Sequence, residues 1–179
     1  MNLTQHDGDR TMKSNRVVSQ EEMLGAEGSG ATESAERVLM IERVFDAPPS
    51  LVFKAWTDPQ HLVHWYGPRG FTLPSCKLDL RTGGAWRSCM LSPEGREHWV
   101  RGVFREIVEP NLLVFTWAHE NEDGALGQET LVTVTFAEQG GKTKLTLHQA
   151  VFESVKERDS HRGGWNSSLD RLAEYLAKA

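Results

Sequence analysis

The stretch GWNSSLDRLAEYL, residues 164–176, decides how the rest of the chain folds. Its apolar residues recur at spacings of 4, 3 and 4, at Trp165, Leu169, Leu172 and Leu176. Charged residues occupy the other face, at Asp170, Arg171, Glu174 and Lys178. This period predicts an amphipathic helix over about 156–178 whose apolar stripe needs a partner to bury it. The Gly163-Gly164 pair lies inside this helix or at its start, where glycine is unfavourable, so we expect a close backbone approach or a helix start there.

A run of short strands upstream supplies that partner. Stretches rich in β-branched and aromatic residues alternate with turn residues, and they predict strands at 72–80, 84–92, 97–108, 112–120, 129–138 and 142–151. Because the connections are short, neighbouring strands should be antiparallel. A two-residue turn at Gly140-Gly141 sets Phe136 opposite Leu145, which brings the apolar side chains of the last hairpin to one face.

The segment before these strands predicts one more strand and two short helices. RVLMIERVF, residues 37–45, is β-branched and apolar enough for a strand. Pro49 suits the first turn of a helix, and Asp58 and Pro59 suit the N-cap and first position of a second. The element order is β-α-α-β6-α. It predicts an α+β fold in which a curved antiparallel sheet of about seven strands wraps the long C-terminal helix.

Composition and charge exclude several classes of protein. The 179 residues are 39% hydrophobic and 25% charged, with a net charge of −5, which is typical of a globular domain. Residues 1–36 contain no aromatic residue and predict a disordered tail ahead of a domain over 37–179. Basic residues are scattered among acids, so we expect no nucleic-acid partner. No apolar stretch is long enough for a membrane span, so we expect a cytoplasmic location.

The two cysteines, Cys76 and Cys89, lie on the first predicted hairpin and lack the spacing of zinc ligands. We therefore expect no metal and no cofactor. If the turn centres on Thr82-Gly83, the cysteines are directly opposite and close enough for a strained disulfide. If it centres on Gly83-Gly84, the register slips and the pairing is lost. In a reducing compartment two buried free thiols are favoured.

Aromatic residues are the strongest candidates for a binding site. Large rings can wall a pocket for an apolar ligand, and an indole N–H can meet a polar group of that ligand. The candidate wall residues are Trp65, Trp86, Phe104, Trp117 and Trp165, followed by Trp56, Trp99 and Phe115. For any single ring, ordinary core packing is the alternative. As a set, several should line a cavity, since one helix seldom fills the hollow of a wide curved sheet.

Histidines on the predicted strands raise the question of catalysis. His98, His119 and His148 could act as general bases beside Glu120 or Asp79. Their spacing selects no reaction, and no nucleophile, phosphate loop or carboxylate pair accompanies them. No catalytic residue is therefore assigned, and solvated strand histidines are the favoured interpretation.

Four segments together resemble a known family. They are FDAPPSLVFKAWTDPQHLVHWYGP (45–68), DLRTGGAW (79–86), VRGVFREIVEPNLLVFTW (100–117) and GWNSSLDRLAEYL (164–176). The chain resembles the START-like, or SRPBCC, superfamily, and within it the domain shared with the C-terminal half of the activator of the 90-kDa heat-shock protein ATPase. The resemblance implies a helix-grip fold with a ligand cavity between sheet and helix.

Three functions follow as hypotheses. The first is a binding module that holds a small hydrophobic molecule in that cavity. The second is a co-chaperone-like module with a protein partner such as a chaperone, as the family name suggests. The third is a cyclase- or hydrolase-like enzyme with its substrate in the cavity. A monomer and a homodimer both remain open, because an uncovered edge strand can pair with a second copy.

Overall fold

The computed structural model describes residues 34–178, which belong to one compact unit. Most of the predicted tail, residues 1–36, lies outside the described residues. Its last three residues are described, and they form a helical turn just before the first strand. The tail assignment therefore stays a prediction.

The element order predicted from the sequence is confirmed. The elements are β1 (Leu39–Phe45), α2 (Pro49–Thr57), α3 (Pro59–Leu62), β2 (Thr72–Leu78), β3 (Ala85–Leu91), β4 (Glu97–Val108), β5 (Leu112–His119), β6 (Thr130–Gln139), β7 (Lys142–Ala150) and α4 (Val155–Leu176). Prolines begin both short helices, and the Asp58 carboxylate caps α3 by accepting from the backbone N–H of Gln60.

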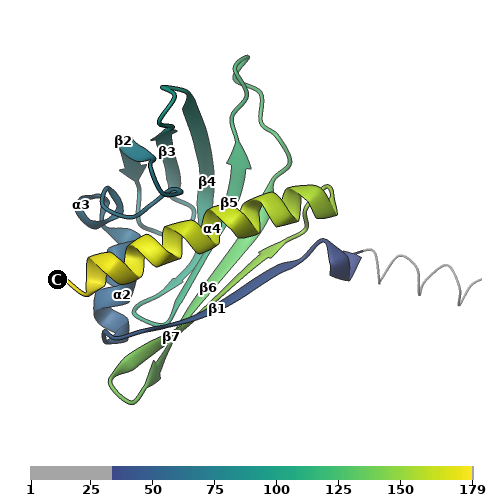
Figure 1. Cartoon of the computed structure of the whole chain (residues 1–179). Coiled ribbons are helices and arrows are strands. Elements are labelled where there is room, and N and C mark those ends of the chain that lie inside the picture. The colour runs from purple at the N-terminus through teal and green to yellow at the C-terminus, as the bar shows by residue number, and fades with distance from the viewer. Residues whose placement is uncertain (1–33, 179) are drawn as a thin grey trace, which may run out of the picture. The chain divides into compact units, whose positions relative to one another are not determined.

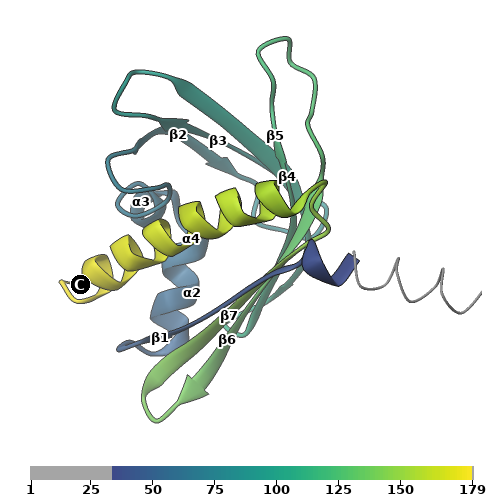
Figure 2. The ribbon, with the colours of Figure 1, turned by 45° about the vertical axis from the view of Figure 1, so that its right-hand side comes forward.

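The seven strands form one antiparallel sheet in the order β1-β7-β6-β5-β4-β3-β2. The sheet curves, and α4 crosses its concave face (Figures 1 and 2). α2 and α3 lie near the C-terminal end of α4 (Figure 1). This is the predicted arrangement of a curved sheet wrapped on a long helix.

The register of the last hairpin is also as predicted. Phe136 faces Leu145 across the Gly140-Gly141 turn. Both side chains are buried, as are Val134 and Leu147, the next facing pair on the same side. Both turn glycines have positive φ, which a residue without a Cβ adopts at little cost.

Burial of one face holds α4 on the sheet. Ser154 caps the helix by accepting a hydrogen bond from the N–H of Glu157, and the predicted stripe from Trp165 to Leu176 is buried. Burying each large apolar side chain contributes about 1.5–3 kcal/mol. The stripe therefore outweighs the cost of two glycines in the helix, which is about 1 kcal/mol each.

The expected helix start or close backbone approach at Gly163-Gly164 is wrong, whereas the favoured state of the two cysteines, free thiols, is the one observed. The helix starts at Val155, so Gly163 and Gly164 lie within it, and the nearest atom to a Cβ on Gly164 is an ordinary 3.9 Å away on Pro68. In the first hairpin Cys76 faces Ser88, and both cysteines are free. This register differs by one residue from the one that would set the cysteines opposite each other, so their side chains project from opposite faces of the sheet.

Candidate ligand-binding cavity

Two hollows lie on the concave side of the sheet. The first, here called the inner cavity, measures about 30 Å³ and is lined by Trp56, Leu62, Tyr66, Leu78, Trp86, Ser88, Phe104, Leu113 and Phe115. The second, here called the histidine-lined cavity, measures about 260 Å³ and is lined by Tyr66, Pro68, Phe71, Met90, His98, Trp117, His119, Ser160, His161, Gly164, Trp165 and Ser168. Tyr66 belongs to both linings.

The inner cavity is too small for an organic ligand. A cavity needs on the order of 10–15 Å³ to hold one water, so about 30 Å³ admits one or two waters at most. The Trp56 indole N–H is buried there without a hydrogen-bond partner. Rings of Trp86, Phe104 and Phe115 fill the remaining space by edge-to-face packing at 5.7–6.2 Å between centroids.

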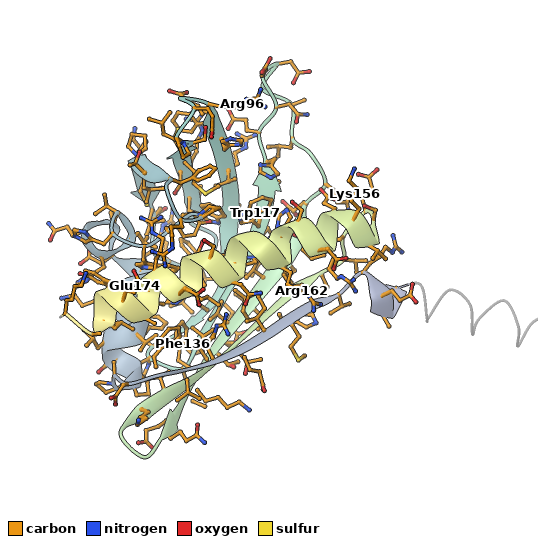
Figure 3. All side chains as sticks on the ribbon, viewed as in Figure 1. Arg96, Trp117, Phe136, Lys156, Arg162 and Glu174 are labelled. Carbon is orange, nitrogen blue, oxygen red and sulfur yellow. The ribbon has the colours of Figure 1, made fainter. Side chains whose placement is uncertain are left out.

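The histidine-lined cavity is formed by three parts of the chain. α4 contributes the side that runs from Ser160 to Ser168, strands β3–β5 contribute the floor, and the loop after α3 contributes the rim. Trp117 lies on the sheet beside α4 (Figure 3). The volume approaches the roughly 300 Å³ at which ligand pockets begin.

A buried polar chain holds the two tryptophans of this cavity. The Trp165 indole N–H donates to Gln149 Oε1 at 2.8 Å, and Gln149 Nε2 donates to Thr130 Oγ1 at 2.8 Å. The Thr130 hydroxyl in turn donates to the Trp117 carbonyl at 3.2 Å. Since Gln149 is fully buried, this chain fixes the Trp165 ring and connects it to the backbone of β5 at Trp117.

Trp117 organises the polar groups around it. The rings of His119 and His161 both meet it edge to face at 4.5 Å, and they are 5.9 Å from each other. Its indole N–H donates to the Tyr66 hydroxyl at 3.4 Å. The cavity therefore presents two imidazoles and a phenol around one indole.

Burial keeps these groups uncharged at neutral pH. Desolvation lowers the pKa of His161 to about 4, with a further lowering from His119. Desolvation also lowers the pKa of His119, followed by the charge of His98. Desolvation raises the pKa of the Tyr66 phenol, and its hydrogen bond with Trp117 opposes that rise. All three side chains recognise hydrogen-bonding groups better than ions.

No Lys, Arg, Asp or Glu belongs to this lining. Within residues 34–178 no group of three or more His, Cys, Asp or Glu is arranged to hold a metal ion. The arrangement thus offers apolar rings with a few neutral polar atoms. It suits an uncharged ligand, because a buried charge without a partner is costly.

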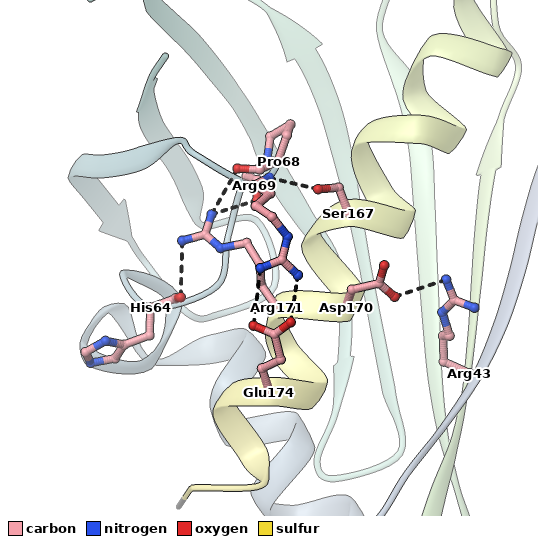
Figure 4. Close-up of polar contacts among 9 residues, drawn as sticks. Arg43, His64, Pro68, Arg69, Ser167, Asp170, Arg171 and Glu174 are labelled. Carbon is pink, nitrogen blue, oxygen red and sulfur yellow. Dashed lines mark hydrogen bonds and ion pairs between the residues drawn. The ribbon is translucent and has the colours of Figure 1, made fainter. Parts of the chain in front are cut away.

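Polar contacts with α4 fasten the rim of the cavity. The Arg171 guanidinium donates to the carbonyls of His64, Gly67 and Pro68 at 2.8–3.2 Å (Figure 4). The Arg69 side chain forms an ion pair with Glu174 at 2.6 Å. The rim loop therefore depends on the face of α4 that points away from the apolar stripe.

The structure separates the eight predicted wall residues into four groups. Trp117 and Trp165 line the histidine-lined cavity, and Trp56, Trp86, Phe104 and Phe115 line the inner cavity. Trp65 lines neither of these hollows, because it is fully buried and donates to the Ala55 carbonyl. Trp99 also lines neither, because it alternates with the inward-facing Val100 and lies on the convex face under the Arg87 guanidinium.

The three histidines predicted on strands lie on two sides of the sheet. His98 and His119 face the cavity, whereas His148 alternates with the buried Leu147 and Gln149 and faces outward. Glu120 is paired with Arg87, and Asp79 with Arg81. Neither carboxylate pairs with an imidazole, so the proposed general-base pairs do not form.

Sequence reasoning missed His161, Met90, Phe71 and Gly164 as lining residues. One signal was available for His161, because it lies four residues before Trp165 and so continues the buried stripe toward the N-terminus of α4. Phe71 and Gly164 carry no comparable pattern. Their role depends on where the loop after α3 meets the helix.

The sheet, the crossing helix and the hollow between them define a helix-grip domain. The family model for Activator of Hsp90 ATPase homolog 1-like protein matches residues 46–177. The chain belongs to this family, which lies within the START-like superfamily.

Solved structures agree with this assignment. The AHSA1 protein from Silicibacter pomeroyi is 32% identical, with a TM-score of 0.71 over 78% of this chain and 97% of that one. A protein from Chromobacterium violaceum is 28% identical, with a TM-score of 0.70 over 78% and 96% of the two chains. No curated protein matches the chain. None of the helices described in residues 34–178 is long and apolar enough to cross a membrane.

Proposed function

We propose that this domain binds a small, uncharged and largely apolar molecule in the histidine-lined cavity. The observation that carries the proposal is a hollow of about 260 Å³ whose lining holds two tryptophans and three histidines but no charged side chain of Lys, Arg, Asp or Glu. Such a hollow has room for a compound of about two to three aromatic rings. The family commonly binds hydrophobic ligands, which supports the same conclusion.

The lowered pKa values of the buried imidazoles favour a binding function over a catalytic one. A general base works best when its pKa lies near the working pH, and the pKa of His161, at about 4, is far below neutrality. No carboxylate orients His119 or His161 in the lining. These imidazoles therefore act as neutral hydrogen-bonding groups.

Titration with N-phenyl-1-naphthylamine, an uncharged fluorescent probe, tests the proposal. We expect saturable probe emission together with quenching of tryptophan fluorescence. Gly164→Leu should weaken binding by about tenfold or more, since its side chain enters the cavity. Gly163→Leu is the matched control, because a Cβ at Gly163 meets open space. Equal binding by both variants, or no saturable binding by the native protein, would refute the proposal.

A further inference from the structure

Three cationic side chains lie side by side on the convex face of the sheet. Lys77 on β2 faces Arg87 on β3, and Arg87 faces Arg101 on β4. We call these three residues the basic row. Adjacent strands are about 4.8 Å apart, so the backbones of Lys77 and Arg101 are separated by about 10 Å. Their neighbours Leu78, Trp86 and Gly102 pair across the same strands on the concave side.

This arrangement opposes the stability of the sheet. Like charges placed directly opposite on neighbouring strands are destabilising. Glu120 forms an ion pair with Arg87, and the charge of Arg101 also helps to lower the pKa of Glu120. Within the described part of the chain neither Lys77 nor Arg101 forms an ion pair of its own. The whole chain carries a net charge of −5, so a general excess of basic residues does not explain the row.

The central guanidinium is held in place. Arg87 binds Glu120 through two hydrogen bonds of 2.9 Å and lies 3.7 Å above the Trp99 ring centroid. The two hydrogen bonds use Nε and Nη2 of Arg87. Its Nη1 group has no hydrogen-bond acceptor among the described residues. A fixed guanidinium loses little conformational entropy when it binds an anion.

The basic row borders a surface hollow of about 420 Å³. The lining contains all three cations and a single carboxylate, that of Glu129. Val103 and Leu126 give the hollow an apolar side, and Leu126 is 44% exposed. The volume of the hollow lies within the range of small-molecule sites. Its concave shape differs from the flat surface that is typical of a protein interface.

We infer that this hollow binds a small molecule carrying two or more linked phosphate groups. Guanidinium groups bind phosphate oxygens through paired N–H donors, and the Lys77 ammonium supplies a further charge. Linked phosphates can meet Lys77 and Arg101 at the two ends of the row while Arg87 donates from its free nitrogen. The apolar side formed by Leu126 accommodates the uncharged remainder of the molecule.

Inorganic tripolyphosphate is the probe for isothermal titration calorimetry on the full chain. We expect one site per chain, with affinity that falls as salt is raised. Arg101→Gln and Lys77→Gln should each weaken binding by about tenfold. Arg162→Gln, on α4, is the matched control and should leave the affinity unchanged.

Thermal melts at low salt distinguish loss of the site from loss of the fold. Without tripolyphosphate, Arg101→Gln should melt at a temperature close to that of the native protein, because it removes both the like-charge contact with Arg87 and the attraction between Arg101 and Glu120. Tripolyphosphate should raise the melting temperature of the native protein and not that of Arg101→Gln. No binding, or equal weakening by all three variants, would overturn the inference. Binding of an acidic peptide but not of tripolyphosphate would also overturn it, in favour of a protein-docking surface.

Discussion

Trp117 is the residue on which the candidate cavity depends most. Its ring contacts both His119 and His161, its N–H donates to Tyr66, and its carbonyl ends the buried chain from Trp165. One side chain thus sets both the shape and the polarity of the cavity. A ligand that contacts Trp117 should report its presence through tryptophan fluorescence.

Gly102 and Gly163 differ in the space available for a side chain, and this difference predicts how substitutions at the two positions change stability. A Cβ at Gly102 would lie 1.7 Å from the Thr116 carbonyl oxygen and 2.6 Å from Trp86 Nε1, which hydrogen-bonds to that oxygen. Gly102→Ala should therefore destabilise the fold by about 3 kcal/mol or more. Gly163→Ala meets open space within a helix and should stabilise it by about 1 kcal/mol. Chemical denaturation measures both, and similar effects from the two variants would contradict the prediction.

His161 predicts how stability changes with pH. Its pKa is about 4 in the folded protein and about 6.5 when unfolded. Between these values the unfolded chain binds a proton that the folded chain does not. The free energy of unfolding should therefore fall as pH drops from about 6.5 to about 4, by up to about 1.4 kcal/mol per pH unit.

Urea unfolding at a series of pH values measures this slope. His119 should contribute in the same direction, because burial lowers its pKa too. His161→Gln should reduce the slope in this window and leave stability at higher pH less affected. An unchanged slope in the variant would show that His161 is exposed to solvent in the folded protein.

At the scale of elements, α4 has two roles that lie on two of its faces. The stripe from Trp165 to Leu176 packs on the sheet, while Arg171 and Glu174 hold the loop that follows α3. Arg43 on β1 also donates to Asn166 at 2.7 Å. The helix is therefore connected to β1, at one end of the strand order, and to the rim of the cavity.

Arg171→Ala tests the second role. It removes hydrogen bonds from a charged donor to the carbonyls of His64, Gly67 and Pro68, and should destabilise the domain by about 1.5–3 kcal/mol. Because that loop carries Tyr66, Pro68 and Phe71, probe binding in the histidine-lined cavity should weaken as well. Arg162→Ala on the same helix should change stability by less than about 0.5 kcal/mol. Denaturation curves and probe titrations of the two variants make the comparison, and equal effects would count against the role of the rim.

Elements were predictable from the sequence where a local pattern specifies them. The Gly140-Gly141 turn fixed the last register, and the Asp58-Pro59 pair located α3. The first hairpin was less certain because its turn is followed by Gly84, whose close approach to the Asp79 carbonyl sets a register that neither considered turn produces. A shift of one residue there decides whether Cys76 meets Cys89 or Ser88.

The sequence predicted a hollow between the sheet and the helix, and only some of the residues that line it. Trp99 and Trp65 were candidates because of their aromatic side chains alone. The structure places Trp99 on the convex face of the sheet and buries Trp65 completely in the core. Contacts between segments far apart in sequence, such as Phe71 with His98, are set by tertiary packing. Aromatic content therefore indicates that a hollow can exist, while the fold decides which rings face it.

At the scale of the whole molecule, the sheet separates two chemically different surfaces. Its concave side holds an uncharged hollow under α4, and its convex side carries the basic row of Lys77, Arg87 and Arg101. Alternation along β3 and β4 makes this possible, since neighbouring residues point to opposite sides. The two proposed sites share only β3 and β4 and lie on opposite faces of them, so their ligands would not compete.

The described residues also predict that the domain folds without the segment before it. Each of the seven strands has its pairing partner within residues 34–178, and the buried core lies in the same range. A chain of residues 34–179 should therefore melt within about 3 °C of the full chain, a difference below that of a typical destabilising substitution. It should also bind N-phenyl-1-naphthylamine with the same affinity. Thermal melts and probe titrations of both chains test this, and a much lower melting temperature for the shorter chain would show that residues 1–33 contribute to the stability of the fold.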